Sequence, residues 1–291
     1  MYNFSVIIPH RNSSNLLSRC LDSMPLRDDL QIIIVDDNSN RPNLENLKEI
    51  VESRKNVELI SLVGENGGAG HARNVGLIHA TGEWILFSDC DDEYSPDMNI
   101  MMDNYLYSDC DIVYYDFIYK YDRNESGPIC SKKLMNEDRD ENKDDFLKYR
   151  ILAPWNKMVR KSLIINNNIK FEECSNGNDI FYSFQVGFFA KNICFFPRVI
   201  YHYYRNVSGI TKKSKNDDSY YLCLFEHIYE CNMFYRNIGH KSWCRSVFVE
   251  IIAIIYRQGL RASIQAANVY IKNKKRIKES RNKYVDFFFK S

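Results

Sequence analysis

The sequence lacks three features that mark membrane-spanning, secreted or metal-cluster proteins. It has no run of about eighteen apolar residues, the length that a helix needs to cross a bilayer, and its most apolar stretch, 247–256, is short and contains Glu250. No secretory signal stands at its start. The nine cysteines are odd in number and never spaced C-x-x-C, so we interpret them as reduced thiols rather than a disulfide or zinc framework. These absences predict a cytoplasmic protein.

A strong net charge is also absent. The 291 residues carry a formal charge of +1, with 45% hydrophobic and 26% charged residues, as expected of an ordinary globular protein of one large or two smaller domains. The balance hides an asymmetry, because residues 241–291 contain twelve basic and three acidic residues. The end of the chain is therefore basic and the rest is acidic.

Short apolar runs alternate with helical patterns over the first 87 residues. Strands are predicted at 4–9, 30–35, 57–62 and 84–87, with helices at about 14–21, 44–51 and 71–79 between them. Continuous apolar runs of this kind are typical of strands buried on both faces of a parallel sheet. The alternation predicts an α/β fold, with a doubly wound, mostly parallel sheet flanked by helices.

Polar residues follow several of these strands. Several residues come at or just after the carboxyl end of a predicted strand: Pro9, Asp36-Asp37, the glycine loop 64–70 and Asp89-Cys90-Asp91. Doubly wound sheets bind their ligands at that edge. We therefore predict one shared site there.

Three carboxylates, those of Asp89, Asp91 and Asp92, follow the fourth strand within four residues. Clustered carboxylates repel one another and are costly to desolvate, whereas a bound Mn²⁺ or Mg²⁺ removes that cost and often brings a diphosphate with it. The alternative is an acidic helix start, although Ser95-Pro96-Asp97 supplies such a start by itself.

The glycine loop GENGGAG is neither a dinucleotide fingerprint nor a P-loop. Its glycines permit close approach of the backbone, and Arg73, one helical turn later, could meet a phosphate or a base. A plain surface loop with a solvated arginine is the alternative. A phosphoacceptor receiver domain is not favoured, because its acidic pair closes the first strand and this one closes the second.

Four motifs in order, SVIIPHRN, IIIVDDNS, GGAGHARNVGLIHATGEWILFSDCDD and NDIFYSF, resemble the family 2 inverting glycosyltransferases with their nucleotide-sugar-binding GT-A fold. The resemblance covers roughly the first 210 residues. It implies that Asp37 binds the base of the nucleotide, with Pro9 and Arg11 beside it. The sequence departs from the family pattern at Arg11, where an aromatic residue is common.

The same resemblance implies a metal and a base. Asp89 and Asp91 match the D-x-D pair, with Asp91 contacting Mn²⁺ or Mg²⁺ and Asp89 contacting the ribose or the metal. Asp179 matches the catalytic base, although Asn178 stands where the family often has Glu. The alternative for Asp179 is a helix cap.

Beyond the sheet, 111–121 is predicted to be a further strand and 122–145 a surface loop. The segment that contains Trp155 and Lys157 resembles the acceptor-side region of the family, where a Trp could stack on a sugar. The alternative is that Trp155 is a core residue. The segment 201–205, with Ser208, resembles one that closes over the diphosphate. Within it, His202 is a candidate third metal ligand, or a hydrogen-bonded, partly buried histidine.

Residues 216–291 are predicted to form a helical, basic extension to a catalytic domain of residues 1–215. The basic stretch 272–283 and the aromatic residues after it suit an anionic membrane surface, where lipid-linked acceptors reside. A solvated basic helix is the alternative. No nucleic-acid-binding motif accompanies the charge.

Taken together, these residues predict a metal-dependent inverting glycosyltransferase that moves a sugar from a nucleoside diphosphate donor, a UDP-sugar by expectation, to an acceptor hydroxyl. The expected role is bacterial surface polysaccharide or glycolipid synthesis, at the inner face of the membrane, with a carbohydrate or lipid-linked acceptor. A sugar-nucleotide nucleotidyltransferase is one rival, but the basic, glycine-rich signature after its first strand is missing. The other rival is a catalytically silent nucleotide-sugar-binding module.

Overall fold

The computed structural model describes residues 1–62, 64, 67–121, 124–136, 143–174, 176–204, 217–280 and 283–289. The chain forms two compact units, one of Met1–Glu173 with Asn178–Asn206 and one of Cys174–Gly177 with Val207–Ser291. The predicted domain boundary after residue 215 lies outside the described residues and stays a prediction.

Parallel strands form the first half of the sheet in the first unit. They are β1 (Phe4–His10), β2 (Leu30–Asp37), β3 (Val57–Leu62) and β4 (Trp84–Phe87), in the spatial order β3-β2-β1-β4. All residues of β2 and β4 are buried, as their continuous apolar sequences predict. The four predicted strands are therefore confirmed, with β1 and β2 slightly longer than expected.

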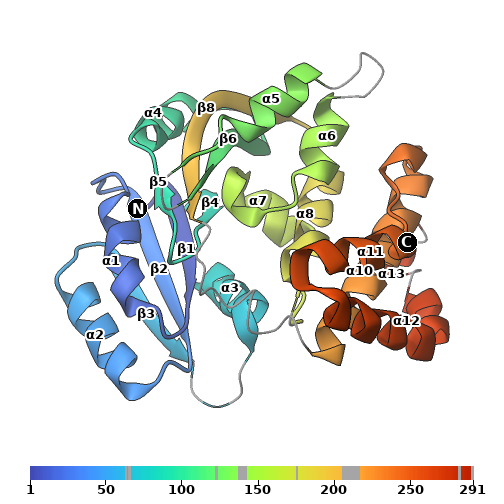
Figure 1. The fold of residues 1–291 in the computed structure, drawn as a ribbon. Helices are drawn as coiled ribbons and strands as arrows, with labels where there is room; N and C mark the ends of the chain where they lie inside the picture. Colours follow the sequence, from blue (N-terminus) through green and yellow to red (C-terminus); the bar gives the residue numbers. More distant parts are fainter. Residues whose placement is uncertain are drawn as a thin grey trace. The chain divides into compact units, whose positions relative to one another are not determined.

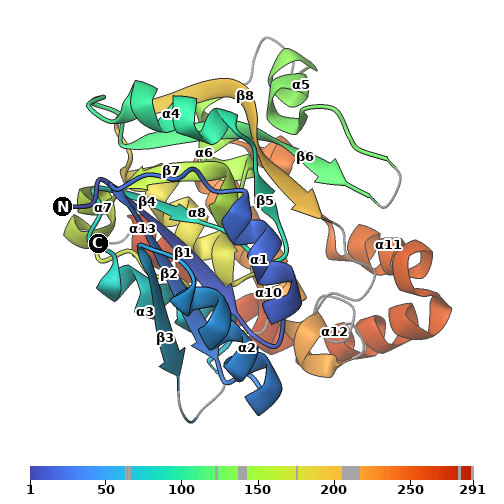
Figure 2. The same cartoon turned by 90° about the vertical axis from the view of Figure 1, so that its left-hand side faces the viewer.

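Helices α1 (Ser14–Asp22) and α2 (Arg41–Glu52) lie on one side of these strands, and α3 (Gly68–His79) lies on the other (Figures 1 and 2). The side changes because the chain runs outward from β1 to β3 and then returns through α3 to β4 on the far side of β1. A Cβ at Gly76 would lie 2.3 Å from Cγ2 of Ile7, so α3 packs closely on β1. The reversal between β1 and β4 is the switch point at which such folds bind ligands.

The second half of the sheet is mixed. It contains β5 (Glu93–Tyr94), β6 (Ile112–Lys120), β7 (Lys157–Arg160) and β8 (Ile193–Tyr204), in the order β7-β6-β8-β5 after β4. Strand β7 is antiparallel to both β4 and β6, whereas β6 and β8 are parallel. The predicted α/β fold with flanking helices is confirmed, although its sheet is mixed because β5 and β7 run antiparallel to their neighbours.

The remaining helices of this unit are α4 (Asp97–Tyr105), α5 (Ile129–Asn136), α6 (Lys143–Arg150), α7 (Lys161–Asn166) and α8 (Asn178–Phe189). The prediction of a surface loop over 122–145 is wrong where α5 and the start of α6 occur. Buried Asp116 of β6 accepts hydrogen bonds from the backbone N–H groups of Ile129, Cys130 and Ser131. This cap comes from a strand, so local sequence does not reveal it.

A disulfide joins Cys110 and Cys194, which corrects the prediction that all cysteines are reduced. The two residues are 84 positions apart, and their Cα atoms lie 6.2 Å apart. Cys194 pairs with Val113 in the β6–β8 ladder, and Cys110 lies just before β6. Strand pairing therefore brings together two cysteines whose sequence spacing carries no signal.

The second unit is helical, as predicted. It contains α10 (Asp218–Asn237), α11 (Val247–Gln258), α12 (Leu260–Ser280) and α13 (Lys283–Phe289). Its separate core includes Tyr221, Phe225, Ile254, Ala266 and Ile277. Within the described residues, no helix is long and apolar enough to cross a membrane.

Candidate active site

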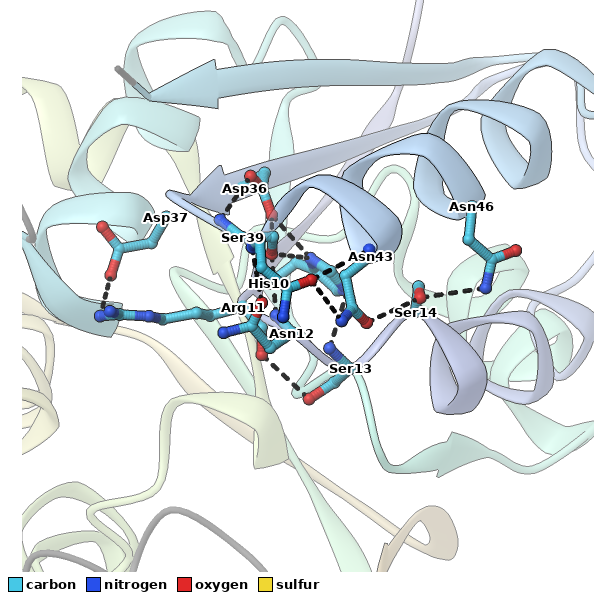
Figure 3. Close-up of polar contacts among 11 residues, drawn as sticks. His10, Arg11, Asn12, Ser13, Ser14, Asp36, Asp37, Ser39, Asn43 and Asn46 are labelled. Atoms are coloured by element: carbon cyan, nitrogen blue, oxygen red, sulfur yellow. Dashed lines mark hydrogen bonds and ion pairs between the residues drawn. The ribbon is translucent and has the colours of Figure 1, made fainter. Parts of the chain in front are cut away.

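Asp37 closes β2 and fastens the glycine loop. Its two carboxylate oxygens accept hydrogen bonds of 3.2 Å from the backbone N–H groups of Gly67 and Gly68, where α3 begins. Arg11, just after β1, reaches the same carboxylate at 3.5 Å (Figure 3). Pro9 lies partly exposed near the end of β1, opposite Val35. The structure thus brings Pro9, Arg11 and Asp37 to one edge.

Asp36, the preceding acid, belongs to a buried network that sequence analysis missed. Its carboxylate lies 2.9 Å from Nδ1 of His10 and accepts hydrogen bonds from the backbone N–H and the hydroxyl of Ser39 (Figure 3). Burial opposes ionisation, but the hydrogen bonds from His10 and Ser39 outweigh it and lower the pKa of Asp36. The network joins the ends of β1 and β2. In the sequence, this network could have been found from a histidine at the end of one predicted strand and an aspartate at the end of the next.

Arg73 connects the carboxylates after β4 to helix α8. One guanidinium nitrogen donates to Oδ1 of Asp89 at 2.7 Å, and another donates to Oδ1 of Asn178 at 2.9 Å. The arginine is 6% exposed and lies over the ring of Phe171. Asn178, the departure from the family pattern, is therefore one end of a bridge that reaches the acidic pair.

The three carboxylates after β4 occupy different environments. Asp92 is fully buried and accepts hydrogen bonds from the hydroxyl of Tyr201 at 2.8 Å and the backbone N–H of Tyr204 at 2.7 Å. Burial, followed by the negative charges of Asp89 and Asp91, raises the pKa of Asp92 well above its usual value. Asp89 and Asp91 remain partly exposed. Asp92 is thus a structural anchor, whereas the other two carboxylates remain accessible to solvent in part.

These residues fit a divalent cation. Asp89 and Asp91 offer hard carboxylate oxygens of the kind that Mn²⁺ and Mg²⁺ prefer. Their combined negative charge, which raises the pKa of Asp92, would be neutralised by such an ion. The backbone of the turn is held in place, because the hydroxyl of Tyr201 accepts from the N–H of Asp89 and Arg19 donates to the carbonyl of Asp91.

Asp179 lies in the first turn of α8 and is partly exposed. Burial and the charge of Asp89 raise its pKa, while the charges of Arg73 and Lys157 oppose this effect, and the net direction is upward. A carboxylate with a raised pKa is a better proton acceptor than an ordinary aspartate. The electrostatic neighbours of Asp179 therefore include Asp89 of the acidic pair and Arg73, which is hydrogen-bonded to Asp89.

Two of the predicted acceptor-side residues lie inside the protein. Trp155 is 7% exposed and stacks on the rings of Tyr201 and Tyr203, at centroid distances of 4.6 and 5.5 Å. Lys157 is fully buried, and its ammonium group donates to the carbonyls of Ile151 and Ala153 and to the hydroxyl of Ser183. Burial lowers the pKa of Lys157 to about 7, although the charge of Asp179 acts in the opposite direction.

His202, the third predicted acceptor-side residue, is partly exposed on β8 and pairs with Glu93 of β5. Burial and then the charge of Lys120 lower its pKa, against the charges of Glu93 and Glu125. Its charged neighbours thus come from β5, from the end of β6 and from the residues just after β6. Arg205 and Ser208 of the same predicted segment lie outside the described residues.

The switch-point edge, with paired carboxylates after β4 and a third acid at the start of α8, defines a glycosyltransferase with the GT-A fold. The sequence model "Glycosyl transferase family 2" matches residues 5–166, more than half of the chain, and the chain belongs to this family. The protein is therefore an enzyme that transfers sugars.

Curated relatives agree with this assignment. The chain is 26% identical to "Putative glycosyltransferase EpsH" of Bacillus subtilis over 250 residues, which are 81% of this chain and 70% of that protein. It is 27% identical to "GalNAc(5)-diNAcBac-PP-undecaprenol beta-1,3-glucosyltransferase" of Campylobacter jejuni over 233 residues, 78% of this chain and 73% of that protein.

Solved structures share the fold. TarS 1-349 of S. aureus in complex with UDP-GlcNAc aligns over 99% of this chain and 89% of that chain, with a TM-score of 0.60 and 19% identity. The mannosyltransferase PcManGT from Pyrobaculum calidifontis, in complex with GDP-Man and Mn²⁺, aligns over 94% and 75%, with a TM-score of 0.56 and 15% identity.

Proposed function

We propose that this glycosyltransferase is metal-dependent and inverting, and that it uses a UDP-sugar to glycosylate an acceptor hydroxyl in bacterial surface polysaccharide or glycolipid synthesis. The Arg73 bridge is the observation that carries the proposal. Its guanidinium contacts Asp89 at 2.7 Å and Asn178 at 2.9 Å, so the carboxylates suited to a metal diphosphate lie beside the helix start that carries Asp179. The UDP-GlcNAc bound by TarS and the lipid-linked acceptor in the name of the Campylobacter relative support the donor and acceptor classes.

The nucleotide would lie across the ends of β1, β2 and β4. Asp37 would accept a hydrogen bond from the base, with Pro9 and Arg11 beside it and Asp89 near the ribose. Because Asp37 also accepts from the N–H groups of Gly67 and Gly68, binding of the base would be coupled to the position of the glycine loop.

Asp91, together with Asp89, would hold the metal, for which we propose Mn²⁺ or Mg²⁺. The ion would supply positive charge that offsets the negative charge developing on the departing diphosphate. Arg73 would keep Asp89 oriented without neutralising Asp91, because its guanidinium is shared between Asp89 and Asn178. Asp92 would hold the turn through Tyr201 and Tyr204.

Asp179 would take the proton of the acceptor hydroxyl while the acceptor oxygen attacks the anomeric carbon opposite the diphosphate. Its raised pKa suits this role, provided that the pH keeps it ionised. Among the proposed acceptor-side residues, only His202 is partly exposed, so it is the one that we propose to contact an acceptor. Trp155, which is buried, would act only by packing against its neighbours. Lys157, also buried, would act through the effect of its positive charge on Asp179.

We propose that residues 216–291 form a separate helical domain. This domain would provide peripheral contact with an anionic membrane. Basic residues cluster late in α12, and α11 exposes large apolar side chains, including Phe248 at 70% and Tyr256 at 88% exposure. Apolar side chains beside basic ones are typical of interfacial helices. The enzyme would then meet a lipid-linked acceptor at the cytoplasmic face.

A panel of nucleotide sugars tests the function. Each donor is incubated with the full chain and Mn²⁺, and release of the nucleoside diphosphate is measured with and without candidate acceptors. We expect one UDP-sugar to be turned over, with an inverted anomeric configuration in the product by NMR. Retention of configuration would contradict the inverting mechanism. Binding without turnover across the panel would indicate the silent module, and pyrophosphate release from a nucleoside triphosphate and a sugar phosphate would indicate the nucleotidyltransferase.

Asp91→Asn tests the metal assignment. The change removes one charged ligand while preserving shape, so the gain in UDP affinity that Mn²⁺ provides should be lost. Calorimetry of UDP binding with and without Mn²⁺ measures this gain. Asp109→Asn, the same change at an exposed aspartate, is the control and should behave like the wild type. An unchanged metal-dependent gain in the Asp91 variant would remove Asp91 from the site.

A further inference from the structure

Two cysteines and a histidine converge within the second unit. The sulfur atoms of Cys174 and Cys223 and a ring nitrogen of His227 all lie within 4.8 Å of one another. Cys223 and His227 are one helical turn apart on α10, so they share a face of that helix. Cys174 comes from the short segment 174–177, which belongs to the same unit although it is 49 positions earlier in the chain.

The separations are those of ligands around a tetrahedral ion. With Zn–S near 2.3 Å and Zn–N near 2.0–2.1 Å, tetrahedral geometry places two sulfurs about 3.8 Å apart and a sulfur and a nitrogen about 3.6 Å apart. Sγ of Cys223 lies 3.7 Å from Nδ1 of His227. Both thiols point to one acceptor, the carbonyl oxygen of Asn176, at 3.2 Å from Cys174 and 3.1 Å from Cys223. The two thiols are therefore directed to a common point, and the ring nitrogen of His227 lies within 4.8 Å of both sulfur atoms.

We propose that Cys174, Cys223 and His227 form a zinc site, with the carbonyl oxygen of Asn176 or a water molecule in the fourth position. Two thiolates and one imidazole are soft and borderline ligands, which select Zn²⁺ over the Mn²⁺ or Mg²⁺ suited to carboxylates. This site is chemically distinct from the carboxylate site and independent of the proposed function.

Zinc would act here as a structural clamp. It would join the segment 174–177 to α10, two parts of the second unit that are far apart in sequence. Asp179 follows this segment in the chain, five positions after Cys174, so the clamp would restrict the backbone just before α8 begins. The thiols would lose their protons on binding, which makes the zinc affinity fall as the pH is lowered.

Metal analysis of the full chain tests the proposal. The protein is stripped with a chelator under reducing conditions and titrated with Zn²⁺ against a chromophoric chelator, without nucleotide or Mn²⁺. We expect one zinc per chain in the wild type, and loss of at least tenfold in affinity in Cys223→Ser and in His227→Asn. Cys231→Ser is the matched control, because Cys231 lies on the same helix outside the cluster, and it should bind like the wild type.

Cobalt substitution of the wild type gives a second measurement that needs no variant. Co²⁺ held by two thiolates should show sulfur-to-cobalt charge transfer and strong tetrahedral d–d bands. Absence of these bands, or equal zinc affinity in Cys223→Ser and Cys231→Ser, would overturn the site. So would a Cys174–Cys223 disulfide in a non-reducing peptide map of protein purified without reductant. None of these measurements uses glycosyl transfer, so their failure would leave the proposed function untouched.

Discussion

At the scale of single residues, the environment of Asp179 decides how the site can work. Arg73 and Lys157 stabilise its charge, whereas burial and Asp89 oppose it, and the balance raises its pKa. The charge of the group that we propose as the base is therefore stabilised by two cations, one of which is hydrogen-bonded to Asp89 of the D-x-D pair. Residue-level substitutions can separate these contributions.

Asp179→Asn should lower turnover by roughly 10²–10⁴-fold with donor affinity nearly unchanged, because the amide keeps the shape but cannot accept the proton. Steady-state kinetics and calorimetry of UDP binding measure the two effects. In the wild type, the raised pKa of Asp179 should place the acid limb of kcat/KM above the pH at which an ordinary aspartate titrates, since the base must be ionised.

Asp97→Asn is the control, because Asp97 begins helix α4 and has no proposed part in transfer. Asparagine caps a helix about as well as aspartate does. Near-normal transfer by the Asp179 variant would therefore show that Asp179 is a cap, and Glu172 or Glu173 would be the next candidates for the base.

Lys157 should make stability depend on pH. Its pKa is about 7 in the folded protein and near 10.5 in the unfolded chain, so the unfolded state binds more protons between these values. The free energy of unfolding of the wild type, relative to that of Lys157→Met, should rise as the pH rises from about 7 to about 10.5. The total change should be on the order of a few kcal/mol. Denaturant titrations of both proteins measure it, and a difference that stays flat over this range would contradict the low pKa.

At the scale of elements, α11 rather than the C-terminal aromatic cluster presents the larger apolar surface. Tyr284 and Phe288 of α13 are buried, and Phe288 packs against Phe234 of α10 at a ring distance of 5.1 Å. By contrast, Phe248 and Tyr256 of α11 are mostly exposed. Truncating the chain at residue 272 would remove buried side chains, so point substitutions test membrane contact more cleanly.

The double variant Phe248→Ser/Tyr256→Ser should bind less to vesicles that contain phosphatidylglycerol, because it removes exposed apolar surface from α11. The wild type should co-sediment with these vesicles, and less so at high salt or with neutral phosphatidylcholine. Tyr107→Ser, at a tyrosine of the first unit that is 91% exposed, is the control. Donor hydrolysis in solution should be unchanged. Equal co-sedimentation of the double variant and the control would leave α11 and the basic end of α12 as ordinary solvated surface.

At the scale of the whole molecule, the Cys110–Cys194 disulfide closes a loop of 84 residues that contains β6, β7 and α8. Cross-links of this kind stabilise proteins mainly by restricting the unfolded chain. Because the loop includes Lys157 and Asp179, the bond also covalently encloses the part of the chain that completes the site. Its effect therefore belongs to the fold as a whole.

Cys110→Ser should lower the free energy of unfolding by about 2–4 kcal/mol under non-reducing conditions. Reductant should destabilise the wild type by a similar amount and leave the variant unaffected, which is the control. A thiol count in denaturant without reductant should give seven free cysteines in the wild type. A count of nine would show that the bond is not formed.

The sequence by itself determined the strands and the sheet edge at which we propose the site. The runs in β1, β2 and β4 are mostly apolar, which indicates strands buried on both faces, and acids at the end of β2 and just after β4 mark the carboxyl ends of those strands. The motifs also predicted the family, and helical periodicity predicted the C-terminal helices. These features are encoded over a few neighbouring residues, so no partner from elsewhere in the chain is needed to find them.

Only the tertiary structure decided how the polar groups are used. Asp92 is an anchor because Tyr201 and Tyr204 arrive from β8, and Arg73 forms a bridge because Asn178 begins α8 beside it. Lys157 is enclosed by carbonyls, although its sequence context suggested an exposed group. Each outcome depends on strand order and on residues that are many positions apart, and a local pattern does not specify which distant side chain will pair with a given acid.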